Sequence, residues 1–481
     1  MLLKHFFIEK IAHSSYLLAG THSCAIIDPQ RDVDIYINEA RAQGVKITHI
    51  LQTHLHADFI SGHMDLAKKT GAKIYVATSA DCTFDHVALA EGDIIALEDM
   101  RLKVLETPGH TPEHLSYVVV DSTRSESPVG VFTGDTLFVG DVGRPDLFPD
   151  MAQELAGKLY HSLHDKLLKL PDHCEVYPAH GAGSLCGRAM GAKQLSTIGY
   201  ERNFNAALQI QDKAEFIKSL TEDMPPAPDH FSRCSDINRQ GPTLITDLPG
   251  VAELEATAFS ERMEEPDVLV LDARNYHAFG SQHIPDTWHL DLNGNFPTFA
   301  GWVLPTDNDI LLVAEDYQQA MEANCWARRV GVDRIVGYLS GGLPGWAVAG
   351  LPSRAVRQLS IEDLHARMNG EANFQLLDVR APQEFADSHI DGALNIPAAE
   401  LRTRADELDK NRTVLVICSS GNRSSLATSI LLQHGFTAVY NVAGGMSGYS
   451  AAGYVGQCRA CVNPHGSRFY SGLSDIAKQR N

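Results

Sequence analysis

The chain has 481 residues, of which 44% are hydrophobic and 21% are charged, as in ordinary globular proteins of about three domains. Its formal net charge of −20 argues against a nucleic-acid or membrane-surface partner, because such surfaces need clustered lysine and arginine. No apolar run approaches the length of a membrane helix. The nine cysteines are odd in number and widely scattered, which predicts a reducing, cytoplasmic location rather than a disulfide framework.

The first predicted domain, residues 1–240, alternates short β-rich runs with turns and helical segments. An apolar strand in it leads into a loop with the sequence T-H-L-H-A-D-F, which offers His54, His56 and Asp58 as metal donors. The pattern H-x-H-x-D-H would supply ligands for two metals. Its last position is Phe59 here, and a phenylalanine cannot coordinate a metal.

Three further motifs with metal-binding side chains follow along the chain. They are P-G-H with His110, T-G-D with Asp135 at the end of a strand, and P-A-H with His180 at the end of another. Donors at the ends of separate strands can converge at one edge of a sheet. The ordered set of four motifs is a much stronger signal than a lone pair of histidines, and it predicts a metal site.

This set of motifs resembles the metallo-β-lactamase superfamily, whose fold is an αββα sandwich. The pattern is most similar to persulfide dioxygenases and to glyoxalase II-type thioesterases. Resemblance to the dioxygenases implies one Fe(II) per chain, held by His54, His110 and Asp135, with positions left open for a substrate sulfur and O₂. It also implies that His56 and Asp58 orient the ligands or bound water.

Resemblance to the thioesterases leaves zinc as the alternative metal. One zinc would then be held by His54, His56, His110 and Asp135, and a second by Asp58, Asp135, His180 and a histidine at position 59. Phe59 removes one ligand of the second zinc, so a mononuclear hydrolase fits the sequence better than a binuclear one. A G-R-P-D run also resembles the dioxygenases, and its Arg144 is predicted to hold a substrate carboxylate.

After residue 240 the chain repeats itself. Leu-Asp-Ala-Arg at 271–274 and Leu-Asp-Val-Arg at 377–380 match at an offset of 106 residues. Phe279 with Phe385 and His283 with His389 match at the same offset, which shortens to 103 further along the chain. We predict two copies of one α/β domain with a parallel sheet, at 241–356 and 357–456, followed by a tail at 457–481.

The second copy carries a reactive loop, C-S-S-G-N-R-S, between an apolar strand and a helical segment. The N–H groups and the dipole at the start of that helix favour an anionic sulfur on Cys418 and hold a bound anion. Gly421 permits the tight curl of the loop, and Arg423 can pair with an anionic substrate. The remaining predicted substrate contacts are Ser419, Ser420, Asn422 and Ser424.

This loop resembles the active-site loop of rhodaneses, which are sulfurtransferases. A cysteine phosphatase commonly has H-C-x5-R-S/T, but here Ile417 precedes Cys418 and the spacing to Arg423 is one residue shorter. The first copy has Glu315 in place of the cysteine and Ala320 in place of the arginine. We therefore interpret the first copy as an inactive, rhodanese-like scaffold.

Other thiols have weaker signals. Cys186 follows a glycine-rich stretch after His180, which indicates a loop near the metal, and it is a candidate for relaying persulfide sulfur. Cys458 and Cys461 form a lone C-x-x-C in the tail, which is weak evidence for metal or redox chemistry.

Together these features predict a persulfide dioxygenase fused to a sulfurtransferase. The expected partners are glutathione persulfide or another low-molecular-weight persulfide, O₂, sulfite and thiosulfate, and the expected assembly is a homo-oligomer. The main alternative is a mononuclear zinc thioester hydrolase with an accessory sulfurtransferase domain. A non-enzymatic alternative, in which the tandem copies sense sulfur or dock a partner, conflicts with the intact Cys418 loop.

Overall fold

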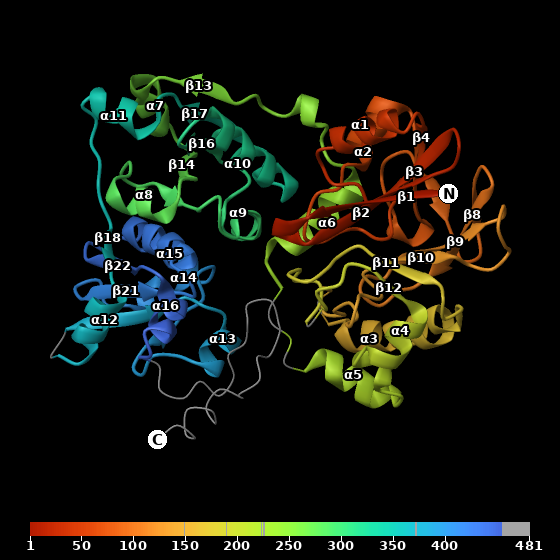
Figure 1. Cartoon of the computed structure of the whole chain (residues 1–481). Helices are drawn as coiled ribbons and strands as arrows, with labels where there is room; N and C mark the ends of the chain where they lie inside the picture. Colours follow the sequence, from red (N-terminus) through yellow and green to blue (C-terminus); the bar gives the residue numbers. More distant parts are fainter. Residues whose placement is uncertain (149, 189, 223, 225–226, 371–372, 455–481) are drawn as a thin grey trace, which may run out of the picture. The chain divides into compact units, whose positions relative to one another are not determined.

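The structure is a computed structural model, and it describes residues 1–148, 150–188, 190–222, 224, 227–370 and 373–454. They form two compact units, one of Met1–Leu248 with Arg328–Gly331 and the other of the rest of the chain from Pro249 onward (Figure 1). No helix within these residues combines the length and apolar character that crossing a membrane requires. The C-x-x-C of the tail lies outside the described residues.

Two six-stranded sheets form the centre of the first unit. One sheet runs in chain order through β1 (Leu2–Ile8), β2 (His13–Ala19), β3 (Ser23–Ile27), β4 (Lys46–Leu51), β5 (Lys73–Ala77) and β6 (Val87–Leu89). The other has the order β12 (Ser196–Thr197), β11 (Glu175–Pro178), β10 (Gly130–Gly134), β9 (Leu115–Asp121), β8 (Met100–Glu106) and β7 (Ile94–Leu97).

Side-chain alternation along the strands builds the layers of this unit. In β2, Tyr16 and Leu18 face the core shared by the two sheets, whereas Leu17 faces Tyr36 and Leu66 of the covering helices, because successive strand residues point to opposite faces. The helices are α1 (Asp34–Ala42), α2 (His63–Thr70), α3 (Ala152–His161), α4 (Ile198–Phe204), α5 (Lys213–Thr221) and α6 (His230–Gln240). Figure 1 shows α1 and α2 on one side of the strands and α3 to α5 on the other. The predicted αββα sandwich is confirmed.

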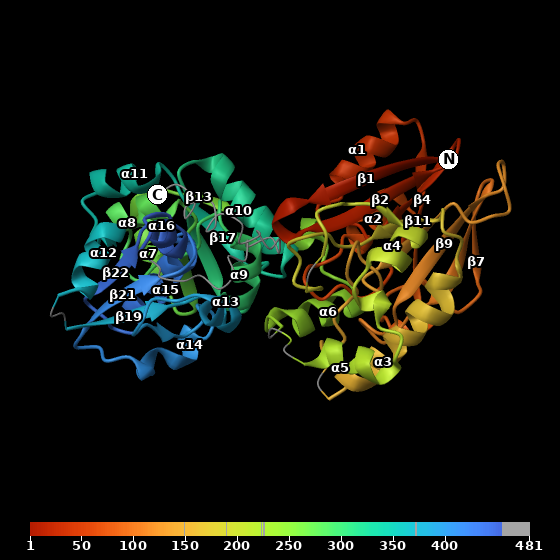
Figure 2. The ribbon, with the colours of Figure 1, turned by 60° about the horizontal axis from the view of Figure 1, so that its bottom comes forward.

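Two five-stranded parallel sheets with the same strand order form the second unit. The first has the order β13 (Ala252–Leu254), β17 (Ile335–Leu339), β16 (Asp309–Val313), β14 (Val268–Asp272) and β15 (Trp288–His289). The second, part of which is seen in Figure 2, has the order β18 (Arg357–Leu359), β22 (Val439–Val442), β21 (Thr413–Ile417), β19 (Phe374–Asp378) and β20 (Leu394–Asn395).

Five helices accompany each of these sheets. In the first copy they are α7 (Ala256–Met263), α8 (Tyr276–Ser281), α9 (Phe296–Val303), α10 (Tyr317–Arg329) and α11 (Gly342–Val348). In the second they are α12 (Ile361–Met368), α13 (Pro382–Asp387), α14 (Leu401–Arg404), α15 (Asn422–Gln433) and α16 (Gly445–Ala451). The identical order of strands and helices confirms the predicted repeat of a rhodanese-like α/β domain.

The repeated L-D-x-R motif makes the same buried ion pair in both copies. Arg274 Nη2 lies 2.5 Å from Asp272 Oδ2, and Arg380 Nη2 lies 2.7 Å from Asp378 Oδ2. Each guanidinium also donates to a backbone carbonyl eight residues further on. The repeated Asp and Arg are therefore structural residues that join the end of a strand to the next helix.

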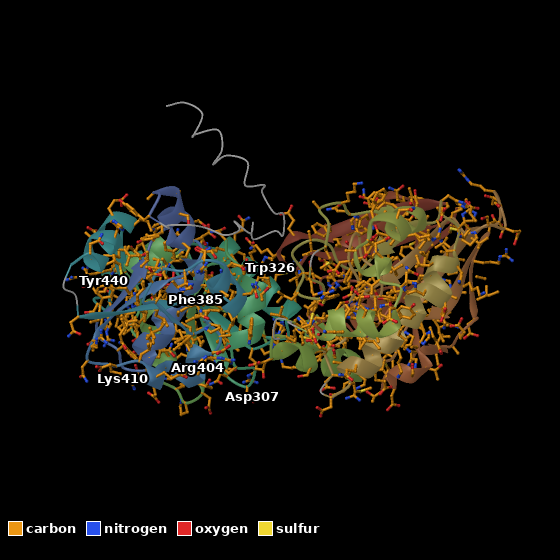
Figure 3. The ribbon with its side chains drawn as sticks, turned by 90° about the horizontal axis from the view of Figure 1, so that it is seen from below. Asp307, Trp326, Phe385, Arg404, Lys410 and Tyr440 are labelled. Atoms are coloured by element: carbon orange, nitrogen blue, oxygen red, sulfur yellow. The ribbon has the colours of Figure 1, made fainter. Side chains whose placement is uncertain are left out.

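The repeated Phe and His also make one shared contact. Phe279 stacks on His283 with ring centroids 4.2 Å apart, and Phe385, which is labelled in Figure 3, stacks on His389 at 4.1 Å. Each histidine Nδ1 donates to the carbonyl of its phenylalanine. These side chains close the end of a short helix in each copy.

Candidate metal centre and cysteine site

Three predicted metal ligands meet in the first unit. His54, His110 and Asp135 come from the loops that follow β4, β8 and β10, and their ligand atoms lie within 4.8 Å of one another. Asp135 Oδ2 is 3.7 Å from His54 Nε2 and 3.4 Å from His110 Nε2. All three side chains are buried.

The other ring nitrogens of the two histidines are already engaged. His110 Nδ1 donates to the Arg144 carbonyl at 2.9 Å. His54 Nδ1 donates to the Thr53 hydroxyl at 2.9 Å, since that hydroxyl donates its own hydrogen to Asp28. Both Nε2 atoms are buried, and neither has a hydrogen-bond partner within the part of the chain that the structure describes. Two oriented imidazole nitrogens beside a carboxylate fit a divalent metal.

Asp28 anchors the histidine-rich loop. Its carboxylate accepts hydrogen bonds from the Thr53 backbone N–H at 2.7 Å and from the Thr53 hydroxyl at 2.8 Å. His56 Nε2 also lies 3.2 Å from Asp28 Oδ1. Asp28 is a functional residue that the motif analysis missed, because it precedes the loop by a whole helix and strand.

A second group of potential ligands lies beside the first. His56, Asp58 and His180 have ligand atoms within 4.8 Å of one another. His180 bridges two carboxylates, with Nε2 3.0 Å from Asp58 Oδ2 and Nδ1 2.8 Å from Asp135 Oδ1. Burial lowers the pKa of His180, but the charges of Asp135 and Asp58 outweigh burial and hold that pKa well above its usual value.

Phe59 fills the neighbouring space with an apolar ring. It is fully buried, and its ring centroid lies 4.1 Å from that of His13 and 4.4 Å from that of His56. His13 is also fully buried, and neither of its ring nitrogens has a hydrogen-bond partner among the described residues. No local sequence signal marks His13, which reaches this place only through the pairing of β2.

His114, which belongs to no metal motif, positions the ligands. Its Nε2 accepts the backbone N–H of Asp135 at 2.9 Å. Its ring stacks on His54 with centroids 4.9 Å apart. Its Nδ1 lies 3.0 Å from the Thr107 hydroxyl. The ring therefore supports two of the three ligands without facing the metal position itself.

Arg144 connects His110 to the loop that carries Cys186. Its guanidinium is buried and donates two hydrogen bonds to Asp146, at 2.7 and 2.8 Å, and one to the Leu185 carbonyl at 3.2 Å. Its backbone accepts from His110 and donates to the Cys186 carbonyl at 3.0 Å. The structure places this arginine as a brace of the site, and its contact with a substrate carboxylate stays a prediction.

Cys186 lies at the metal site. Its sulfur groups with donor atoms of Asp135 and His180 within 4.8 Å, and its side chain packs with Phe138 and Phe231. Burial raises the pKa of the Cys186 thiol well above its usual value, and the nearby carboxylates act in the same direction. The relay role of this thiol stays a prediction.

The predicted cysteine loop of the second copy curls around its own sulfur. Cys418 is buried, and its Sγ accepts hydrogen bonds from the Gly421 N–H at 3.1 Å and from the Ser424 hydroxyl at 3.3 Å. Gly421 has a φ of +112°, and a Cβ there would lie 2.9 Å from the ring of Tyr276. Only glycine fits this corner. Ser419, Ser420 and Asn422 line a cavity next to the loop.

Arg423 is bound by a carboxylate of its own domain. Its Nη1 and Nη2 lie 2.6 and 2.8 Å from the two oxygens of Glu384. Burial raises the pKa of Glu384, but the hydrogen bond and charge of Arg423 outweigh burial and lower that pKa to about 2. In the first copy Ala278 and Ala320 stand at these two positions. The first copy therefore has neither residue of this ion pair, just as it lacks the cysteine.

Comparisons with known protein families cover the regions of the chain that contain these two groups of residues. Residues 9–180 match the model of the metallo-beta-lactamase superfamily, and residues 255–349 and 360–452 each match the rhodanese-like domain. Mitochondrial persulfide dioxygenase ETHE1 of Mus musculus is 31% identical over 47% of this chain and 84% of its own length.

The chain belongs to the metallo-β-lactamase superfamily and carries two rhodanese-like domains.

The chain is also similar to a hydrolase and to a solved metallo-beta-lactamase structure. A hydroxyacylglutathione hydrolase of Rhodopseudomonas palustris is 33% identical, covering 44% of this chain and 73% of the relative. A solved metallo-beta-lactamase structure from Staphylococcus aureus is 35% identical, with a TM-score of 0.64, covering 70% of this chain and 98% of that one. The superfamily member described here is an enzyme with a metal-binding first unit.

The Glu384 to Arg423 pair of the second rhodanese-like domain makes a testable contribution to stability. We expect Glu384→Gln to destabilise this domain by about 1–2 kcal/mol at neutral pH, a value reduced for partial solvent exposure. Because the pKa of Glu384 falls from 4.5 to about 2 on folding, the contribution is complete above pH 4.5. It is lost as the pH falls toward 2.

Calorimetric melting of the full chain at neutral and acidic pH measures this difference. The matched control is Glu407→Gln, which removes a carboxylate that pairs with Arg404 at the surface. Equal shifts in melting temperature for the two variants would contradict a special role for the Glu384 pair.

Proposed function

We propose that the first unit is a non-heme iron dioxygenase that oxidises a low-molecular-weight persulfide to sulfite. The observation that carries this proposal is the set of His54, His110 and Asp135, in which both histidine Nε2 atoms are buried beside the carboxylate without a hydrogen-bond partner among the described residues. Phe59 supports a one-metal site because it occupies the place of a further ligand. The persulfide dioxygenase from mouse supports the substrate class.

The overall reaction consumes a persulfide, O₂ and water, and it yields the thiol and sulfite. Iron(II) held by these three residues would supply open positions for the substrate sulfur and O₂. The buried rings of Phe138 and Phe231 limit access of water to the site beside Cys186. His180 contacts both Asp58 and Asp135, at 3.0 and 2.8 Å, and so fixes the positions of the two carboxylates.

The second rhodanese-like domain is proposed to move sulfur through Cys418. A Cys418 persulfide can give its outer sulfur to sulfite, which forms thiosulfate and returns the Cys418 thiolate. That thiolate is stabilised by the hydrogen bonds that the Gly421 N–H and the Ser424 hydroxyl donate to Sγ. The reverse direction, from thiosulfate to a thiol, uses the same groups. Removing reactive sulfite where it forms gives a reason to join the units in one chain.

Anaerobic purification, metal analysis and O₂ uptake with glutathione persulfide test this proposal. We expect one iron per chain, O₂ uptake that depends on the persulfide, and sulfite as the product. Zinc in the purified protein, with no O₂ uptake but with cleavage of a hydroxyacylglutathione thioester, would overturn it. That result would establish the alternative of a mononuclear zinc hydrolase, which the similarity to the Rhodopseudomonas palustris relative favours.

Restoring the missing ligand tests the role of Phe59. We expect Phe59→His to raise the metal content from one to two ions per chain and to introduce thioester cleavage, because Asp58, Asp135 and His180 already lie together there. Elemental analysis of the purified protein measures the change. Phe59→Leu is the control, since it removes the ring without adding a donor. A folded Phe59→His variant that still binds one metal would show that other features restrict the site.

A further inference from the structure

A cavity of about 220 Å³ lies beside the cysteine loop, and both rhodanese-like copies line it. The second copy contributes residues of the Cys418 loop and of α15, including Arg423. The first copy contributes Asp291, Asn295, Phe296 and Phe299, at and before the start of α9. At ~30 Å³ per water molecule, the cavity has room for about seven waters, which is enough for a small organic thiol.

The first copy also contacts the cysteine loop around this cavity. The Tyr276 ring packs against Gly421. The backbone of Gly294 approaches the side chain of Asn422 so closely that a Cβ at position 294 would lie 2.9 Å from Asn422 Nδ2. Behind the loop, His289 Nδ1 lies 2.9 Å from the Ser425 hydroxyl of α15. The copy without a cysteine therefore forms one wall of the cavity that adjoins the Cys418 loop.

Of the charged side chains that line the cavity, one already pairs with a carboxylate of its own domain. Asp291 and Arg423 are the charged side chains among the described residues that line it. The guanidinium of Arg423 is held by both oxygens of Glu384. The Asp291 carboxylate accepts one backbone N–H on each oxygen, from Tyr276 and from Asn293, and each oxygen keeps a further lone pair. Glu384 offsets the charge of Arg423, so the net charge of these three side chains is negative.

We propose that the inactive first copy selects the organic thiol that exchanges sulfur with Cys418, and that this thiol carries an ammonium group. Its carbon skeleton packs against Phe296 and Phe299, and its ammonium group pairs with Asp291. The amides of the cysteine loop remain for sulfite or thiosulfate. This inference rests on sulfur transfer at Cys418, and it defines the substrate class at that site.

The transfer itself needs no further reactant. The Cys418 thiolate attacks the outer sulfur of the organic persulfide, so the S–S bond of the persulfide breaks and a new S–S bond forms on Cys418 Sγ. The organic thiolate leaves and takes a proton from water. The reverse step returns the sulfur to the organic thiol. The organic thiol occupies the same cavity in both directions, so the rate of either step tests how well the cavity binds it.

Three small thiols that differ mainly in charge test the inference. The full chain is loaded with sulfur from thiosulfate, and the addition of one sulfur atom to Cys418 is verified by mass spectrometry. Discharge is then timed with cysteamine, 2-mercaptoethanol and 3-mercaptopropionate, each rate being divided by the rate of the same thiol with a free persulfide. We expect the normalised discharge rate with cysteamine to be about ten times the rate with 3-mercaptopropionate. This ratio corresponds to about 1.4 kcal/mol.

Two variants change the charge of the wall in different ways. Asp291→Asn should reduce the ratio of the two normalised discharge rates, cysteamine over 3-mercaptopropionate, to about one. Asn295→Lys, at an exposed position that needs no refolding of the core, should reverse the preference even if Asp291→Asn fails to fold. Asp316→Asn is the control, because Asp316 caps α10 of the same copy and does not line the cavity.

The outcomes separate this inference from the proposed function. If Cys418 acquires sulfur but the ratio is the same in the wild type and both variants, sulfur transfer stands and the selective role of the first copy is wrong. A wild-type preference for 3-mercaptopropionate would also overturn it. If Cys418 acquires no sulfur from any donor, the proposed sulfurtransferase function itself fails.

Discussion

Cys418→Ser should abolish the formation of thiosulfate while O₂ uptake with glutathione persulfide continues at the wild-type rate. The loss should be roughly a thousandfold or more, because a serine hydroxyl cannot accept and release sulfane sulfur as the thiolate does. Sulfite should accumulate in proportion to the O₂ consumed. Simultaneous recording of O₂, sulfite and thiosulfate measures the separation of the two activities.

A half-buried thiol elsewhere in the chain provides the control for this variant. Cys325→Ser makes the identical chemical change on α10 of the first copy, and we expect both activities to be retained. If Cys418→Ser also removes O₂ uptake, the two sites are not separable and the proposed division of labour is wrong.

His110→Ala should remove bound metal and reduce O₂ uptake by roughly a thousandfold or more. Two protein ligands would remain. Changing a residue that only hydrogen-bonds to a ligand lowers metal affinity by about 10–100-fold, and we expect removal of a ligand itself to lower it further. Sulfur transfer from thiosulfate through Cys418 should persist, because that loop belongs to the second unit. Elemental analysis and O₂ uptake on the same preparation measure the effect.

His173→Ala is the matched control, since His173 is an exposed histidine of the same unit. It should keep its metal and its O₂ uptake. A His110→Ala protein that retains one tightly bound iron and normal O₂ uptake would show that the reaction takes place elsewhere in the chain.

The two rhodanese-like copies share one fold but differ in the residues at the position of the cysteine loop. The Asp and Arg that brace each sheet are retained in both copies, at Asp272 with Arg274 and at Asp378 with Arg380. The first copy has lost the cysteine and both members of the ion pair that clamps the loop. Its remaining contribution is packing and the wall of the cavity beside Cys418.

Local sequence was sufficient for the fold class and for the residues of the metal motifs. The alternation of β-rich and helical segments, the repeat of L-D-x-R and the four ordered motifs all depend on short-range patterns that are read directly from neighbouring residues. Phe59 could be recognised as a missing ligand for the same reason. These patterns also indicated that the loop of the second copy, and not that of the first, carries the reactive thiol.

Tertiary structure alone decided which partner each functional group has. The fold pairs Arg423 with Glu384, which is 39 residues away in the chain, and the contact of Arg423 with an anionic substrate stays a prediction. The place of His13 beside Phe59, and the wall that the inactive copy builds beside Cys418, likewise depend on contacts between segments far apart in the chain. Composition and spacing determine which groups are present, but the packing of sheets and helices determines which of them are buried together.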